Sequence, residues 1–322
     1  MKKFLINFFE LIKEAFKEWK ADKVSRLAAA LSYYTIIALA PLVLVLLSLL
    51  GLFMRTEQAG KLFMEQALGL VGQGGSEFFE QLIQSTRNVP KTLTSNLIAL
   101  GTAAFGASGL FVQLKDAINT AWGIPSERLK GFKFFVRARA HSFGAILILG
   151  IILLVSLLVS TALTALRSEL GPWLGDAASV VDFLNQLISL LIFCGLFAFM
   201  FRYLPLIELK WSDVLPGAFF TAILFSLGKY AFAIYLGSTN IGGTYGAFGS
   251  LIVVLLWVFY SSQILLFGSE FTQVYASKYG SMADKPSPKK VLEGLDGETV
   301  LLACEKLKAG GYSPINADNE IK

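Results

Sequence analysis

The sequence predicts an all-α membrane protein with six transmembrane helices and both termini in the cytoplasm. Three observations predict this fold: an apolar composition, repeated apolar runs of membrane-spanning length, and a one-sided distribution of Lys and Arg. Hydrophobic residues make up 55% of the 322 positions, and charged residues make up only 16%. A soluble domain has about a quarter charged residues, so a water-soluble fold is not expected.

Apolar runs long enough to cross a bilayer occur repeatedly along the chain. A helix of roughly 20 apolar residues crosses the hydrocarbon core. The six runs cover residues 31–53, 93–114, 143–166, 183–201, 214–236 and 247–267. The first run is expected to remain as an anchor. The N-terminus is charged through Lys20 and lacks a short apolar segment followed by a small-residue cleavage site.

Lys and Arg are concentrated on one side of these runs. Of the 28 Lys and Arg residues, 22 lie on the side of the two termini, five lie on the opposite side, and Lys229 lies within a run. Because cytoplasmic segments are enriched in Lys and Arg, both termini are predicted to be cytoplasmic. Basic residues facing anionic lipid also explain the net charge of +5. No nucleic-acid partner is expected.

The chain is predicted to have three parts. Residues 1–26 form an amphipathic helix at the cytoplasmic face, residues 27–280 form the six-helix transmembrane domain, and residues 281–322 form a short cytoplasmic tail. Apolar side chains recur at helical spacing in the first part: Phe4, Phe8, Leu11, Ala15 and Trp19. This apolar face suits either the membrane surface or the cytoplasmic face of the protein itself.

The longest connection on the outer side covers residues 54–92. Its apolar residues are too sparse for a span but fit two short amphipathic helices, which the glycine-rich stretch 72–75 separates. We expect these helices to cover the outer mouth of the bundle. In the second span, Thr102, Gly106 and Gly109 form a stripe of small residues that allows close helix packing.

Residues for catalysis or metal binding are sparse. His141 is the single histidine, and no serine or cysteine nucleophile motif accompanies it. No cluster of His, Cys, Asp and Glu has metal-ligand spacing, and no phosphate-binding loop of the GxxxxGK[ST] type is present. Cys194 and Cys304 fall in a span and in the tail, so they do not predict a disulfide. The sequence therefore predicts no enzyme activity, no cofactor and no metal.

Two charged residues lie where lipid is expected. Lys229 lies within the fifth run, where a central lysine costs about 2.5–3.5 kcal/mol of insertion free energy. It could extend outward past Tyr235, or face a polar cavity and meet an anionic group. Glu270 lies near the cytoplasmic end of the sixth span. It could form a structural ion pair with a basic residue such as Arg202, or it could respond to protons.

Hydroxyl groups open the first span, where a dry bundle requires them to find partners. Tyr33 and Tyr34 could line a cavity or donate hydrogen bonds to a neighbouring helix. Together with the charged residues they make up the candidate substrate path, which comprises Lys229, Tyr230, Tyr33, Tyr34, Glu270 and Arg202.

Several segments resemble those of a known family. They are residues 28–51 (AAALSYYTIIALAPLVLVLLSLLG), 202–205, 210–211, 213, 216–217, 228–230, 244–247 and 257–270. In combination they resemble the BrkB/YihY family of bacterial membrane proteins, over roughly residues 20–275. The resemblance implies a six-helix bundle in the inner membrane. Members once carried the label ribonuclease BN, but this chain has no carboxylate cluster or histidine pair to activate water.

The resemblance and the residues together favour transport. Roles proposed for the family include movement of lipids or lipid-linked precursors, ion exchange, and envelope or serum resistance as a virulence factor. We expect a transporter or flippase of an amphipathic, anionic lipid. A cation/proton antiporter that uses Glu270 is one alternative, and a non-transporting envelope scaffold is another. The expected partners are membrane lipids, and a homo-oligomer is left open.

Overall fold

The computed structural model describes most of the chain, and every structural statement below concerns the described part. The described residues are 2–50, 56–87, 93–124, 178–239, 245, 248–286, 288–292 and 300–313. The expected third span and His141 lie outside them. Within these ranges the regular elements are helices, apart from a bridge position at Ile207. The predicted all-α fold is confirmed for this part of the chain.

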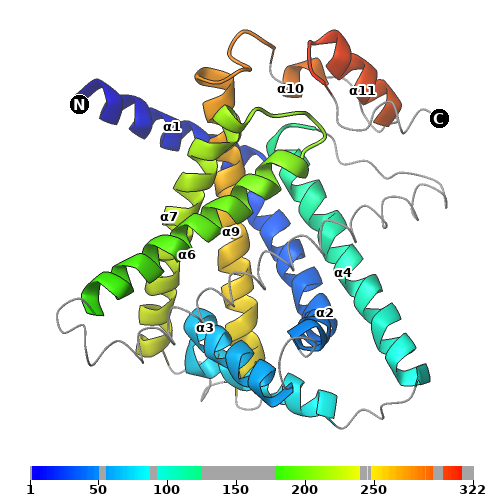
Figure 1. Ribbon diagram of the computed structural model, residues 1–322. Helices are drawn as coiled ribbons and strands as arrows, with labels where there is room; N and C mark the ends of the chain where they lie inside the picture. Colours follow the sequence, from blue (N-terminus) through cyan, green and yellow to red (C-terminus); the bar gives the residue numbers. More distant parts are fainter. Residues whose placement is uncertain are drawn as a thin grey trace.

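Long helices cross one another at inclined angles to form a bundle (Figure 1). They are α2 (Val24–Leu50), α4 (Leu93–Ala121), α6 (Ala178–Tyr203), α7 (Trp211–Ser238) and α9 (Gly249–Lys278). The central helix is α9, which contacts all the other four and also α1 and α3. It extends well past residue 267, where the apolar run ends, because its later polar residues are buried rather than solvated.

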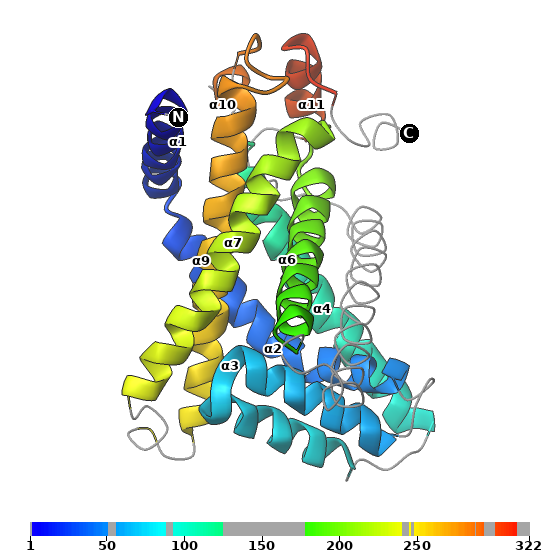
Figure 2. The ribbon, with the colours of Figure 1, turned by 60° about the vertical axis from the view of Figure 1, so that its left-hand side comes forward.

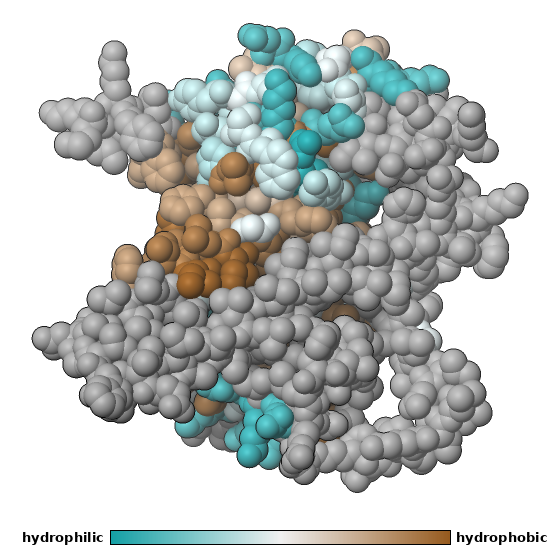
Figure 3. Space-filling view, in the orientation of Figure 1, coloured by the Kyte–Doolittle hydropathy of each residue, from teal (hydrophilic) through white to brown (hydrophobic). Residues whose placement is uncertain are grey.

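Three described helices are long and apolar enough to cross a membrane. They contain the segments Gln186–Tyr203, Trp211–Ser238 and Gly249–Lys278, and α2 contributes a shorter apolar segment, Val24–Ala40. Figure 3 shows apolar side chains gathered in a band below the hydrophilic end of the molecule. These features support a membrane protein. The count of six spans and the orientation of the termini stay predictions.

The first helix, α1 (Lys2–Ala21), packs against α9 through its apolar face. Leu11 and Ala15 are buried in a cluster that includes Phe271 and Val274. An ion pair between Glu14 and Lys278, with 3.3 Å between Oε2 and Nζ, ties the same two helices together. Part of the predicted apolar face therefore packs on the protein itself. The neighbouring side of α1 is exposed at Phe9 and Phe16.

The helix α3 (Thr56–Arg87) bends back on itself at Gly72 and lies across one end of the bundle (Figure 2). Gly72 has φ 68° and ψ −175°, a conformation that glycine adopts without the steric penalty of a Cβ atom. The two arms bury Ala67, Val71, Phe79 and Ile83 against side chains of α2, α7 and α9. Two amphipathic helices separated at the glycine-rich stretch are thus present as predicted.

The C-terminal segment packs on the opposite end, near α1. It contains α10 (Pro288–Val291) and α11 (Val300–Ala309) (Figures 1 and 2). Leu307 and Tyr312 belong to the main hydrophobic cluster, together with Phe201 of α6. The backbone N–H of Glu208 donates a hydrogen bond to the carbonyl of Ser313, with 2.9 Å between the atoms. The connection between α6 and α7 is therefore held against the tail.

Candidate functional site

Lys229 is half-buried on α7 and lies beside two other polar groups. Its ammonium nitrogen is 5.6 Å from the centre of the Tyr230 ring, within the range of a cation–π contact. The Tyr230 hydroxyl accepts a hydrogen bond from Nε2 of Gln186 on α6, at 2.6 Å. We call these three residues the seam cluster, because the hydrogen bond between Gln186 and Tyr230 joins α6 and α7.

The direction of Lys229 follows from its helical spacing. Residues at i, i+3 and i+7 share a helix face, so Lys229 lies on the same side of α7 as Ala222 and Phe225. Ala222 is completely buried, and the Phe225 ring lies 4.9 Å from that of Phe193 on α6. Lys229 therefore lies on the side of α7 that packs against α6.

An apolar stripe lies on a different side of α7. Its members are exposed and recur every four residues up to Leu227, followed seven residues later by Ile234: Leu215, Phe219, Ile223, Leu227 and Ile234. Tyr230 is half exposed and lies in line with this stripe, three residues after Leu227 and four before Ile234. In a membrane, exposed apolar side chains at this spacing suit contact with acyl chains. The seam cluster thus places polar groups at the edge of an apolar surface.

Glu270 is completely buried on α9. Two contacts between α7 and α9 flank Glu270: Gly268 lies against Thr221, and Gly217 lies against Thr272. Gly228, next to Lys229, instead lies against Tyr260 and Ile264 of α9. The helix rises about 1.5 Å per residue, so Lys229 and Glu270 occupy different depths and the structure does not bring them together.

Other polar side chains share the face of α9 on which Glu270 lies. Gln263 lies seven residues before Glu270 and Gln273 lies three residues after it, and Ser262 and Ser269, seven residues apart, line the adjoining side of the helix. Ser262 and Ser269 are buried. Within the described part of the chain, Oγ of Ser269 and Oε1 of Gln263 have no hydrogen-bond partner. This polar face lies inside the bundle on its most central helix.

Tyr33 and Tyr34 lie near the start of α2. Tyr33 is 61% exposed and Tyr34 is 38% exposed, and their rings meet edge to face at 5.6 Å. The Tyr34 ring lies against Gly109 of α4, one of the small residues expected to allow close helix packing. The Ser32 hydroxyl, within α2, donates a hydrogen bond to the carbonyl of Ala28 in the preceding turn of the same helix, at 2.8 Å. The two tyrosines lie apart from the seam cluster.

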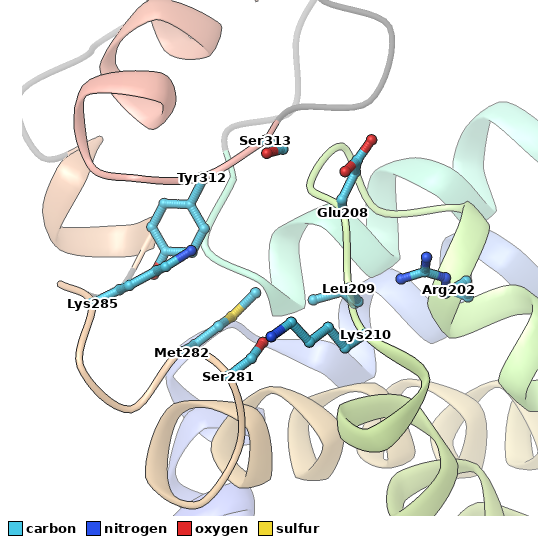
Figure 4. Close-up of a pocket in the computed structure, with 9 residues that line it drawn as sticks. All are labelled: Arg202, Glu208, Leu209, Lys210, Ser281, Met282, Lys285, Tyr312 and Ser313. Carbon is cyan, nitrogen blue, oxygen red and sulfur yellow. The ribbon is translucent and has the colours of Figure 1, made fainter.

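Arg202 lies at the end of α6, with its guanidinium carbon 5.7 Å from the centre of the Trp211 ring. It lines a pocket of about 310 Å³ at the end of the bundle where α10 and α11 pack (Figure 4). We call it the basic pocket, and its lining residues are Arg202, Glu208, Leu209, Lys210, Ser281, Met282, Lys285, Tyr312 and Ser313. Three cationic groups and a single carboxylate surround it.

Sequence reasoning did not predict the basic pocket apart from Arg202. Its walls come from the α6–α7 connection, the turn after α9, and the residues after α11. No local spacing links these segments. The one available signal was the presence of apolar residues in the tail, among them Leu292, Leu307 and Tyr312, because such residues indicate that a segment docks on a core.

Comparison with known proteins decides the family. The family described as "Virulence factor BrkB" matches residues 15–292. The chain belongs to the BrkB family. Relatives of this chain are named UPF0761 membrane proteins, and the described part of this chain has helices long and apolar enough to cross a membrane. It is an integral membrane protein of this family.

The relatives of this chain have low sequence identity to it. A UPF0761 membrane protein of Pseudomonas paraeruginosa is 28% identical over 251 residues, which cover 77% of this chain and 58% of the relative. A Psychrobacter relative is 26% identical over 274 residues, covering 83% and 48%. One from Klebsiella pneumoniae is 29% identical over 205 residues, covering 60% and 68%. The chain thus spans little more than half of the Pseudomonas relative. No solved structure matches it.

Proposed function

We propose that this BrkB-family protein moves an anionic, amphipathic lipid across the bacterial inner membrane. The observation that supports this proposal is Lys229, which is half-buried within a membrane-spanning helix. A lysine there costs about 2.5–3.5 kcal/mol on insertion scales unless it meets water or an anion. The phosphate of a lipid headgroup would supply the anion, and the ammonium would attract it as a point charge.

The neighbours of Lys229 suit both ends of such a lipid. The Tyr230 hydroxyl and the Gln186 amide can donate hydrogen bonds to a phosphate at the seam between α6 and α7. The exposed apolar stripe of α7 offers a surface for the acyl chains. A lipid on this path would keep its chains in the bilayer while its headgroup passes along the seam.

The test is lipid translocation in reconstituted vesicles. Lys229→Met should reduce the movement of a fluorescent phosphatidylglycerol by roughly tenfold or more, because a charge-assisted hydrogen bond contributes about 1.5–3 kcal/mol. Lys229→Arg should retain part of the activity. Lys61→Met, at an exposed lysine on α3, is the control and should translocate like the wild type. Full translocation by Lys229→Met would overturn the proposal.

Thermal unfolding of the same variants separates binding from structure. If Lys229 contacts substrate, Lys229→Met should melt at the wild-type temperature or above, because the insertion cost disappears. A lower melting temperature would indicate that Lys229 stabilises a buried anion of the protein itself. Absence of lipid movement by the wild type would instead favour the scaffold role.

Cation/proton exchange is a second candidate, supported by the complete burial of Glu270 among polar side chains of α9. A buried carboxylate inside a membrane protein can bind and release a proton. Glu270→Gln should preserve membrane insertion and abolish cation-driven proton flux, measured with a pH-sensitive dye trapped in vesicles. Unchanged flux and unchanged melting temperature would exclude a role for Glu270 in exchange.

A further inference from the structure

We propose that the basic pocket binds a phosphate group. Arg202, Lys210 and Lys285 place three positive charges around it, and Glu208 supplies one negative charge. The site lies at the end of the bundle, apart from the seam cluster on α6 and α7. It therefore does not depend on the transport proposed for Lys229.

The positive charges of the basic pocket are not paired with carboxylates of the described residues. Within the part of the chain that the structure describes, no ion pair joins a carboxylate to Arg202, Lys210 or Lys285, in contrast to Lys278, which pairs with Glu10 and Glu14. The Arg202 guanidinium lies over Trp211, which fixes its plane and leaves its N–H groups able to donate. Lys210 points toward Ser281 in Figure 4.

The walls of the pocket are held in place by hydrogen bonds between its three segments. The Tyr312 hydroxyl donates to the carbonyl of Pro286 at 2.6 Å, and Nζ of Lys285 donates to the carbonyl of Gly311 at the same distance. On the opposite wall, the Ser281 hydroxyl and backbone N–H both donate to the buried carboxylate of Asp213. A site whose walls are already ordered loses little entropy when a ligand binds.

The chemistry of the pocket fits a phosphate better than a carboxylate or a neutral ligand. The planar guanidinium of Arg202 can donate two parallel hydrogen bonds to phosphate oxygens. Two lysines can balance the remaining charge, and the volume of about 310 Å³ is at the small end of the range for ligand sites. The phosphate could come from a phospholipid headgroup at the membrane surface or from a soluble phosphate compound.

Binding to the purified full chain distinguishes these sources. Calorimetry would use two probes: pyrophosphate, and a short-chain phosphatidylglycerol that dissolves as monomers. Binding of either probe supports the site. Binding of pyrophosphate alone indicates a soluble phosphate, and binding of the lipid alone indicates a headgroup. Affinity should fall as salt is added, because the attraction between charges is screened.

Variants assign the binding to the pocket. Lys210→Gln and Arg202→Gln should each weaken binding about tenfold or more, the effect of losing one charge-assisted hydrogen bond. Lys306→Gln, on α11 but outside the pocket, is the control and should bind like the wild type. Lys210 is exposed, so its variant remains informative even if Arg202→Gln folds poorly. Wild-type binding of neither probe, or unchanged binding by Lys210→Gln, would overturn the proposal.

Discussion

Tyr312 shows how one side chain holds the C-terminal segment. Its ring is buried and lies 5.1 Å from Nζ of Lys285, and its hydroxyl donates to Pro286. Burial raises the pKa of Tyr312 above its ordinary value, because a charged phenolate is disfavoured away from water. The side chain thus stabilises the docked tail only while it is protonated.

The raised pKa of Tyr312 determines how docking of the tail depends on pH. Because the pKa of Tyr312 is higher in the folded protein, its contribution is complete below the ordinary tyrosine pKa of about 10. It is lost as the pH rises through the raised folded value. The protection of residues 300–313 against hydrogen exchange, measured relative to the intrinsic exchange rate at each pH, should therefore fall in the alkaline range. Tyr312→Phe should remove this pH-dependent step, and an identical alkaline response in that variant would contradict the prediction.

At the scale of elements, α7 and α9 are held together by two reciprocal contacts. Thr221 donates to the carbonyl of Gly217 at 2.6 Å and packs against Gly268. Thr272 donates to the carbonyl of Gly268 at 2.7 Å and packs against Gly217. Each glycine thus has a threonine of the other helix in the space that a side chain would occupy. Small residues at such crossings allow membrane helices to approach closely.

Substitution at this crossing should separate the helices. A Cβ atom at Gly268 would lie 1.9 Å from Oγ1 of Thr221, so Gly268→Ala should destabilise the bundle by about 1–3 kcal/mol through overpacking. The measurement is the melting temperature in detergent. Gly195→Ala on α6 is the matched control, since nothing lies within 4 Å of its Cβ position. Equal melting temperatures for the two variants would show that the crossing has room.

The sequence predicts a feature of these helices when neighbouring residues along the chain determine it, and does not predict it when contacts between distant segments do. The break of α3 within the glycine-rich stretch 72–75 was predictable, because glycine favours interruption of a helix on its own; it occurs at Gly72, whereas Gly74 and Gly75 stay helical. The extent of α9 was not, since Ser269 and Glu270 look like the end of a span but are buried. The contact of Gly217 with Thr272 and the basic pocket were not predictable either. Their residues meet only through packing between distant segments.

At the scale of the whole molecule, the two ends of the bundle should lie on opposite sides of the membrane. The structure places α1 and α11 at one end and the bend of α3 at the other (Figure 1). The excess of Lys and Arg near the termini predicts that the first end is cytoplasmic. The membrane sidedness of each end can be tested separately.

Single cysteines placed at exposed positions test this orientation. With Cys194 and Cys304 first replaced by serine, Gln73→Cys at the bend of α3 should react with an impermeant maleimide in intact cells. Asp284→Cys, after the end of α9, should react only after permeabilisation. Both positions are exposed, so access to the reagent depends on the membrane alone. Labelling of Asp284→Cys in sealed cells would reverse the orientation.

The packing of Leu307 and Tyr312 into the main hydrophobic cluster also bears on biosynthesis. That cluster begins with Val24 and Ala28, so residues made early on the ribosome remain partly uncovered until the segment containing Tyr312 has emerged. Long-range contacts of this kind slow folding and leave apolar surface open in the meantime. A premature stop before residue 307 should therefore yield a chain that inserts into the membrane but is degraded by quality-control proteases.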